Sequence, residues 1–304
     1  LILKESIRIN GEDSNDSNVN IDTTVQEKNI TFPTDAKLHK KIIDKCKRIA
    51  DNEGISLRQS YTRTLKKLSV DQRFRNHPKN KAKAKKADKK VKTIAGRLVR
   101  EIERNLAPRS IYQIDLDLFK RILAQTKQSI NKIYSLHEPD VCCISKGKEH
   151  KKYEFGNKAS IVKTDTGVIV GALGFRNEYD GHTLEPALEQ VLRLTGQLPK
   201  KAKVDRGYRG KKQIGQTEIM IPSTPKKSDT YYQRNKISKA HKKRAAIEPI
   251  IGHIKADHRL NRNFYKGIVG DNINIMLAAA AFNFKRMMNK WKSSFLLYFK
   301  KIIG

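Results

Sequence analysis

Residues 241–255 read HKKRAAIEPIIGHIK, and the placement of charge in this stretch organises the interpretation of the whole chain. An α-helix advances about 100° per residue, so residues three, four and seven positions apart share a face. One carboxylate flanked by cations on a single face, beside an apolar face of isoleucines, predicts an acidic metal ligand among phosphate contacts. A solvated charged face with an i,i+4 Arg–Glu pair is the alternative, and it is the commoner use of such a pattern. The residues of the charged face are His241, Arg244, Glu248 and Lys255.

Pro249 interrupts this pattern immediately after the carboxylate. Proline lacks a backbone N–H, and it disfavours the helical conformation in the residue before it, which here is Glu248. The helix is therefore either kinked at this point or begins here.

The spacing of three residues in the stretch matches a known signature. Arg244, Glu248 and Lys255 form the pattern R-x3-E-x6-K. This pattern resembles the signature Y-x2-R-x3-E-x6-K of bacterial insertion-sequence DDE transposases. His241 stands where the tyrosine of that signature would be, so it can donate to a phosphate but cannot stack as tyrosine does.

The resemblance extends over most of the chain, from about Lys4 to Trp291. Residues 247–263 (IEPIIGHIKADHRLNRN) and 204–211 (VDRGYRGK) are similar to the branch of these transposases named after insertion sequence five. Transposases of this kind carry a further N-terminal domain, commonly credited with recognising the ends of the element. Because the chain begins at Leu1 and contains almost none of that domain, we expect an N-terminally truncated transposase.

The charge balance points to nucleic acid as a partner. The 304 residues include 64 Lys and Arg against 31 Asp and Glu, a formal net charge of +33. Charge of this size opposes compaction unless a polyanion neutralises it, so double-stranded DNA is the expected partner. A ribosomal or chromatin-like binding protein shares this composition, so charge alone does not predict an enzyme. A membrane surface is the weaker candidate, because the basic residues are spread without amphipathic anchors.

Cysteine usage and hydropathy predict a cytoplasmic protein, and the expected DNA partner makes it nucleoid-associated. Cys46, Cys142 and Cys143 form no disulfide framework, which fits a reducing compartment. No signal peptide is visible, and the apolar run Ile273–Phe284 is too short to span a bilayer. We therefore expect no membrane segment.

Periodicity divides the chain into three segments. Residues 1–34 contain two alternating stretches that are separated by a polar turn. Residues 35–135 follow a helical period without strand signals, and residues 136–304 return to strands and helices. The middle segment is rich in lysine, most densely over Lys79–Lys92. A face that follows DNA phosphates is one interpretation of these lysines, and a solvated helix surface is the other. The expected fold is thus α/β, with an all-helical insertion after the first strand.

Local patterns predict the elements at the start of each sheet segment. Residues 1–10 (LILKESIRIN) alternate and predict a strand. Residues 18–24 (NVNIDTT) predict a short strand that carries Asp22 at its C-terminal tip. Residues 165–167 (DTG) predict a hairpin turn between two apolar strands.

Two later segments complete the expected core. Residues 201–210 (KAKVDRGYRG) predict a strand that ends in Asp205, followed by a loop framed by glycines. Residues 225–240 (PKKSDTYYQRNKISKA) are expected to form a polar loop. Its Tyr231 and Tyr232 either stack on bases or pack within the loop itself.

The order of these elements predicts the fold and, with the resemblance, the chemistry. The order along the chain is that of an RNase H-like mixed sheet with flanking helices: an acid at a strand end, a hairpin, a helix, a second acid at a strand end, and an acid on a helix. The resemblance implies that Asp22, Asp205 and Glu248 are catalytic and hold two Mg²⁺ or Mn²⁺ ions. Such ions, about 3.5–4 Å apart, activate the attacking oxygen and stabilise the leaving one. The reaction would be hydrolysis at an element end, then attack of the freed 3′-hydroxyl on target DNA.

Cations near these acids are expected to bind DNA phosphates. Lys255 and Arg244 are the first candidates, because they belong to the signature. Arg206 and Arg209, on the glycine-framed loop, and His241 are further candidates.

The first interpretation is therefore a DDE transposase that acts on element ends and target DNA, and a homo-oligomer on DNA is compatible with it. A structure-selective nuclease on the same fold would need the same carboxylates. A catalytically silent DNA-binding remnant is the alternative from a different class. Three acids retained in the expected order argue against decay of the site.

Overall fold

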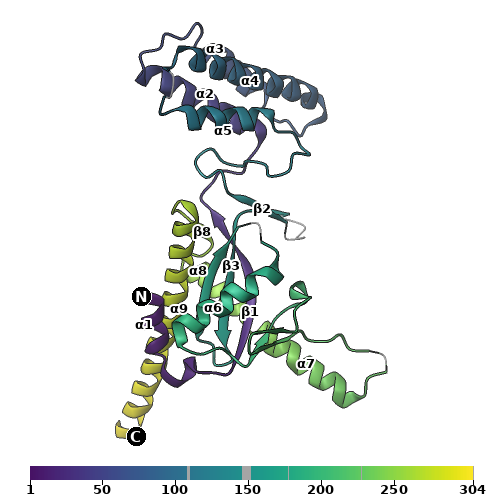
Figure 1. The fold of residues 1–304 in the computed structure, drawn as a ribbon, viewed down its shortest axis with the longest axis vertical. Helices are drawn as coiled ribbons and strands as arrows, with labels where there is room; N and C mark the ends of the chain where they lie inside the picture. Colours follow the sequence, from purple (N-terminus) through teal and green to yellow (C-terminus); the bar gives the residue numbers. More distant parts are fainter. Residues whose placement is uncertain (108–109, 146–151, 177, 227, 304) are drawn as a thin grey trace. The chain divides into compact units, whose positions relative to one another are not determined.

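The chain forms two compact units, seen here in a computed structural model (Figure 1). The sheet unit combines Leu1–Asn29 with Cys142–Gly304, and the helical unit is Ile30–Val141. The structure describes residues 1–107, 110–145, 152–176, 178–226 and 228–303.

An eight-stranded mixed sheet forms the centre of the sheet unit. Its strands are β1 (Asn18–Lys28), β2 (Cys142–Ser145), β3 (Tyr153–Thr164), β4 (Ile169–Phe175), β5 (Lys201–Lys203), β6 (Gln213–Ile214), β7 (Thr217–Met220) and β8 (Arg262–Asn263). The order is β2-β3-β1-β5-β7-β6, with β4 beside β3 and β8 beside β1. β1 runs antiparallel to β3 and parallel to β5, and β5 runs parallel to β7. The expected mixed α/β fold is confirmed.

The hairpin predicted at residues 165–167 joins β3 to β4. Gly167 takes a φ of +97°, a conformation that glycine adopts without steric strain. Ile161, Val162 and Ile169 on these two strands are fully buried. Branched side chains pack well on a pleated surface, so this hairpin forms much of the core of the unit.

Two expectations for the start of the chain are wrong. The opening residues form a helix, α1 (Ile2–Arg8), because Leu3 and Ile7, about one turn apart, are both buried. β1 is longer than expected, so Asp22 lies near its middle and not at its C-terminal tip. The long antiparallel pairing with β3 accounts for the additional length.

The polar loop expected at residues 225–240 is largely a helix, α7 (Tyr231–Ala245). The Thr230 hydroxyl accepts a hydrogen bond from the Gln233 backbone N–H, and the Gln233 side chain accepts one from the Thr230 backbone. This capping box stabilises the first turn. None of the residues of α7 is buried, so the apolar period that reveals most helices in a sequence is missing.

The other helices of the sheet unit cover the sheet. α9 packs against β4 and α1, and α6 packs against β4 (Figure 1). α6 ends at Gly196, which takes a φ of +83° at the helix C-terminus. Among the helices of the described residues, none combines the length and apolar character that a membrane span needs. The elements are α6 (Leu184–Thr195), α8 (Ile247–Asp257) and α9 (Gly267–Ile303), with the short 3₁₀ helices η1 (Gly11–Ser14), η2 (Asp180–Thr183) and η3 (Arg206–Tyr208).

The helical unit has a core of its own. Thr34 caps the first helix, its hydroxyl accepting a hydrogen bond from the Lys37 backbone N–H at 3.3 Å. Buried apolar residues such as Ile42 and Leu98 recur at the helical period and pack together. Every lysine between Lys79 and Lys92 lies on an exposed face. The helices are α2 (Asp35–Asn52), α3 (Thr62–Asp71), α4 (Pro78–Asn105) and α5 (Gln113–Ala124).

A buried ionic network joins α9 to the sheet. The carboxylate of Asp271, on α9, is fully buried. Its Oδ1 lies 2.5 Å from Lys28 Nζ and accepts from Asn263 Nδ2 at 2.7 Å. Its Oδ2 lies 3.2 Å from Arg176 Nη2 and also accepts from Asn157. Because two cations and two amides surround one carboxylate, its charge is compensated within the core.

Candidate functional site

The parallel pairing of β1 with β5 brings two acids together. The register pairs Asn20 with Lys203. Both side chains donate to Asp165 at 2.8 Å or less, so they share one face of the sheet. Side chains alternate along a strand, so residues two positions further on lie on the same face. Those residues are Asp22 and Asp205.

Asp205 is held in place by the turn that follows β5. It caps η3, and its Oδ1 accepts a hydrogen bond from the Gly207 backbone N–H at 2.7 Å. A Cβ on Gly207 would come within 2.9 Å of that oxygen and 3.3 Å of Asp180 Oδ2. Glycine is therefore needed for this close approach. The other oxygen, Oδ2, lies 3.6 Å from Arg244 Nη2.

The stretch around Pro249 contains two helices. α7 ends at Ala245, and α8 begins at Ile247. Pro249 lies in the first turn of α8, where its missing N–H leaves no helical hydrogen bond unmade. Of the two possibilities that the sequence left open, a kink and a start, the structure shows a start.

The guanidinium of Arg244 lies among three carboxylates. Its Nη2 is 3.0 Å from Asp22 Oδ2 and 3.6 Å from Asp205 Oδ2. Its Nη1 donates to Glu248 Oε1 at 3.1 Å across the helix junction. The three acidic side chains are 14%, 39% and 61% exposed in that order, so the cluster opens to solvent at Glu248. A single cation thus faces three negative charges, and we name these four residues the acid cluster.

Burial raises the pKa of Asp22 to about 6. Arg244 and the backbone N–H of Thr23 oppose this rise, while the charges of Asp205 and Glu248 add to it. An acid whose pKa lies near neutrality exchanges its proton under working conditions, which is common at functional sites. The Asp22 carboxylate is therefore fully available to a cation only above about pH 6.

The donor chemistry of the acid cluster suits a divalent metal ion. Carboxylate oxygens are the ligands that Mg²⁺ and Mn²⁺ prefer. Within the part of the chain that the structure describes, however, no group of three Asp, Glu, His or Cys side chains is arranged to hold an ion. The Arg244 guanidinium lies between the acids, where its positive charge stands in for that of a metal. The acids can share an ion only when this side chain turns away.

Two of the other expected phosphate contacts lie on elements that carry acids of the cluster. Lys255 follows Glu248 by two helical turns on the same face of α8. Arg209 is exposed directly after η3, on the loop behind Asp205. Both positions are compatible with a phosphate contact.

The remaining two expected contacts bind the segment that follows β7. His241 Nε2 lies 3.0 Å from the backbone carbonyl oxygen of Ser223. Arg206 Nη2 donates to Thr224 Oγ1 at 2.7 Å. These side chains therefore tie a connecting segment to α7 and η3.

Asp180 is a further carboxylate near the acid cluster, and the sequence analysis missed it. Its Oδ1 accepts from Thr23 Oγ1 at 3.0 Å and from Lys158 Nζ at 2.9 Å. Burial, followed by the charges of Asp180 and the two aspartates of the cluster, raises the pKa of the buried Tyr208 hydroxyl, which stays protonated. The signal was present in residues 179–186 (YDGHTLEP), where an acid and a glycine directly precede a helix.

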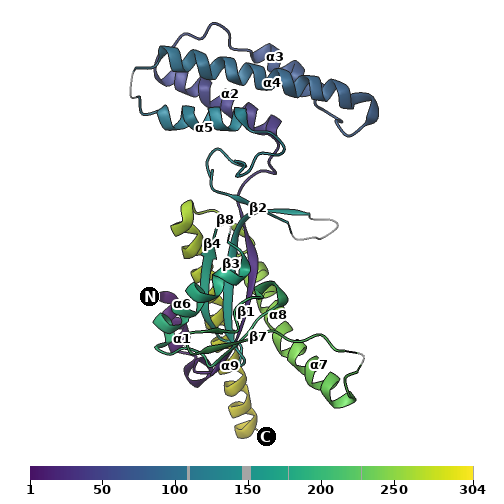
Figure 2. The ribbon, with the colours of Figure 1, turned by 45° about the vertical axis from the view of Figure 1, so that its right-hand side comes forward.

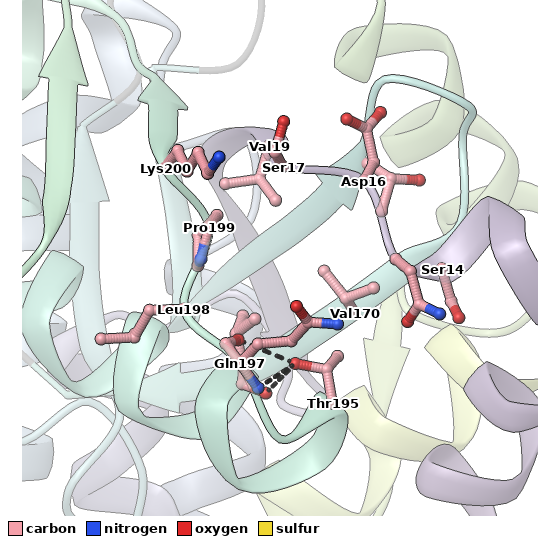
Figure 3. A pocket seen from close by; sticks show the side chains of 13 residues that line it. Ser14, Asp16, Ser17, Val19, Val170, Thr195, Gln197, Leu198, Pro199 and Lys200 are labelled. Atoms are coloured by element: carbon pink, nitrogen blue, oxygen red, sulfur yellow. Dashed lines mark hydrogen bonds between the residues drawn. The ribbon is translucent and has the colours of Figure 1, made fainter.

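A separate pocket lies at the N-terminal end of β1 (Figure 3). It encloses about 80 Å³, and Asp16, Val19, Thr195 and Lys200 are among its lining residues. The Thr195 hydroxyl donates to the Gln197 backbone carbonyl at 3.0 Å across its rim. No acid of the acid cluster lines this pocket, so the two features are distinct.

Comparison with known proteins identifies the family of this chain. A protein of Rhizobium meliloti described as "Uncharacterized protein ORF8 in nfe locus" is 49% identical over 59 residues, which cover 19% of this chain and 28% of that protein. No solved structure matches the chain. The family described as "Transposase DDE domain" matches residues 125–284, more than half of the chain. The chain therefore belongs to the Transposase DDE domain family.

Proposed function

We propose that this chain is the catalytic core of an insertion-sequence-five-like transposase that cleaves DNA at element ends and joins the freed ends to target DNA. The observation that carries the proposal is the gathering of Asp22, Asp205 and Glu248 around one guanidinium. The family implies DNA as the substrate, and a net charge of +33 suits it. Asp205 and Glu248 lie within the matched residues 125–284, whereas Asp22 lies outside them. The fold brings Asp22 close to the other two acids.

The order of the strands supports an RNase H-like core. β4, β3, β1, β5 and β7 follow each other across the sheet, and β3 is antiparallel to both β1 and β4. The first acid then lies on the central strand, the second follows the fourth strand of the core, and the third lies on a late helix. In this proposal residues 1–34 and 136–304 form the core, and residues 35–135 are a helical insertion.

The three acids are the residues that would hold two Mg²⁺ or Mn²⁺ ions. When bound, such ions activate the attacking oxygen and stabilise the leaving oxygen of a phosphodiester. Arg244 offsets the mutual repulsion of the acids while DNA is absent. Its planar, bidentate guanidinium then turns to a DNA phosphate, and Lys255 holds a second phosphate on the same side.

Proton binding and metal binding compete at Asp22, so we expect metal affinity to depend on pH. The raised pKa, about 6, means that below this pH the carboxyl is protonated and must lose its proton before it binds a cation. Mn²⁺ affinity should weaken by up to about tenfold per pH unit below pH 6 and level off above it. Calorimetric titrations measure this, and Asp22→Asn should remove the dependence. Equal parental affinity at about pH 5 and 7 would contradict the assignment.

Lys255→Ala is expected to weaken DNA binding and to flatten its salt dependence. Each phosphate contact contributes about 0.9 to the slope of log affinity against log salt concentration. Titrations with duplex DNA between about 50 and 200 mM salt measure that slope. Lys200→Ala removes the same charge from an exposed position outside the acid cluster and serves as the control. If Lys255→Ala keeps the parental slope, Lys255 does not contact phosphate.

A cleavage assay tests the proposed function as a whole. The protein is incubated with Mg²⁺ and duplexes carrying the inverted repeats that flank its gene, beside scrambled and branched duplexes. The proposal expects metal-dependent cleavage at the repeat ends and strand-transfer products. Preference for branched DNA would instead indicate a structure-selective nuclease. Binding without cleavage of any duplex would indicate a silent remnant.

A further inference from the structure

Helix α7 lacks the apolar face that attaches most helices to a core. It has 15 residues, and none of them is buried. Figures 1 and 2 both show it extending away from the sheet. A helix that is polar on all sides is typically stabilised by a partner or by many side-chain pairs along its own surface. Within α7 no ion pair joins two of its own residues in the described structure, so a partner is the better explanation.

The charge of α7 specifies the kind of partner. No acidic residue lies between Asp229 and Glu248. Cations concentrated in this way, without intervening carboxylates, attract a polyanion. The six cations of this segment are Arg234, Lys236, Lys239, Lys242, Lys243 and Arg244.

Four residues of α7 are spaced at i, i+4, i+7 and i+11. At about 100° per residue they fall within a sector of roughly 60°, so they form one stripe along the helix. All four are exposed, Tyr232 by 77%. The lysines of the stripe form no ion pair with any residue in the described ranges. We call this the α7 stripe; its members are Tyr232, Lys236, Lys239 and Lys243.

We propose that the α7 stripe binds the DNA strand that leads away from the acid cluster, with its lysines on phosphates and the Tyr232 ring stacked on an unpaired base. Lys243 directly precedes Arg244, which contacts the acids, so the near end of the stripe adjoins the acid cluster. A rise of about 1.5 Å per residue puts Tyr232 roughly 18 Å from Arg244 along the helix. That distance is roughly five nucleotides at 3.4 Å per base. The inference rests on the proposed function for the identity of the partner as DNA.

The chemistry of Tyr232 selects an unpaired base over a duplex. In a duplex the faces of the bases are covered by their neighbours, whereas a single strand offers them to an aromatic ring. Every base has such a face, so stacking tolerates any sequence, and cations that follow the backbone commonly accompany it. The stripe therefore suits a strand that is unpaired a few nucleotides from the acid cluster.

Removing two lysines of the stripe tests its electrostatic part. The full chain carrying Lys236→Gln and Lys239→Gln is compared with the full chain carrying Arg234→Gln and Lys242→Gln. Both variants lose two charges from the same helix, but only the first loses them from the stripe. With a tailed duplex of arbitrary sequence and no metal, the first should reduce the salt slope by about 1.4, at about 0.7 per contact with a single strand. The second should reduce it by less than half as much, and equal reductions would overturn the proposal.

Neighbouring tyrosines test the stacking. Tyr232→Ala should weaken binding to a single-strand-tailed duplex about tenfold and leave blunt duplex binding unchanged. Tyr231, although 86% exposed, lies outside the stripe, so Tyr231→Ala should have no effect. Tyr232→Phe should retain parental affinity, because stacking needs only the ring. Equal effects of the two alanine variants, or loss of affinity in Tyr232→Phe, would overturn the stacking.

A base analogue measures the distance. The fluorescence of 2-aminopurine, placed at successive positions of the tail, should be quenched most at about five nucleotides from the cleavage position, and Tyr232→Ala should abolish the quenching. All binding is measured without metal, whereas cleavage needs metal and depends on the acids. A negative result in the binding experiments therefore contradicts the role of the α7 stripe and leaves the proposed cleavage activity to its own assay. If the stripe variants change the oligomeric state in gel filtration and leave DNA affinity unchanged, the stripe is a protein interface and the proposal is wrong.

Discussion

Asp205→Asn is expected to reduce metal-dependent DNA cleavage by about a thousandfold or more, because a carboxylate that holds a catalytic cation contributes several kcal/mol to the transition state. Asparagine can still accept the hydrogen bond that Asp205 Oδ1 accepts from the Gly207 N–H. The turn after β5 should therefore persist, and the loss reports the missing negative charge. Single-turnover cleavage of an end duplex with Mg²⁺ measures the effect.

Two controls separate this effect from a structural one. DNA affinity of Asp205→Asn should equal or exceed that of the parent, since a negative charge near the phosphates is removed. Asp165→Asn removes a carboxylate from the same face of the sheet, where it is paired with Lys203, and should leave cleavage close to the parental rate. Cleavage by Asp205→Asn at the parental rate would show that Asp205 is not a catalytic ligand.

Asp271→Ala is expected to lower the free energy of unfolding by about 3–5 kcal/mol, because it leaves buried cations without their counter-charge. Lys28 Nζ and Arg176 Nη2 both contact the Asp271 carboxylate, which is fully buried. Urea unfolding followed by circular dichroism measures the change. The effect should be visible without DNA or metal, since the network lies apart from the acid cluster.

An ion pair of similar composition at the surface is the control for that prediction. The Asp13 carboxylate lies 2.9 Å from Arg286 Nη2 and 2.9 Å from Lys290 Nζ, and both cations are on α9. Unlike Asp271, Asp13 is partly exposed. Asp13→Ala should cost at most about 1 kcal/mol, because solvent screens such pairs. If Asp271→Ala and Asp13→Ala have similar effects, the buried network does not stabilise the sheet unit.

Patterns confined to a few neighbouring residues predicted their structures well. The hairpin at residues 165–167 and the start of the helical segment at residue 35 both depend on local backbone preferences. Such preferences act over two to four residues, so the sequence is sufficient to reveal them. The signature formed by Arg244, Glu248 and Lys255 is local for the same reason.

The errors have a common physical origin in contacts between distant segments. The sequence of α1 alternates apolar and polar residues, as that of a strand does. The helix forms because it buries Leu3 and Ile7, and α1 packs against α9. β1 continues beyond Asp22 because β3, more than a hundred residues later, supplies a long antiparallel partner. α7 has no core face, so it carries none of the hydrophobic period on which sequence interpretation relies.

The sequence by itself determined the mixed α/β class, the transposase resemblance and the residue types of the acid cluster. Only the tertiary structure decided that Asp22 and Asp205 lie beside each other, because this requires the parallel pairing of β1 with β5, two strands that the helical unit separates in the sequence. It also decided the position of Arg244, which the signature presented as a phosphate contact. In the folded protein Arg244 forms the i,i+4 ion pair with Glu248 that was the alternative interpretation of the sequence. The same guanidinium also forms an ion pair with Asp22. Three carboxylates crowded by folding repel one another, and the nearest cation lies between them.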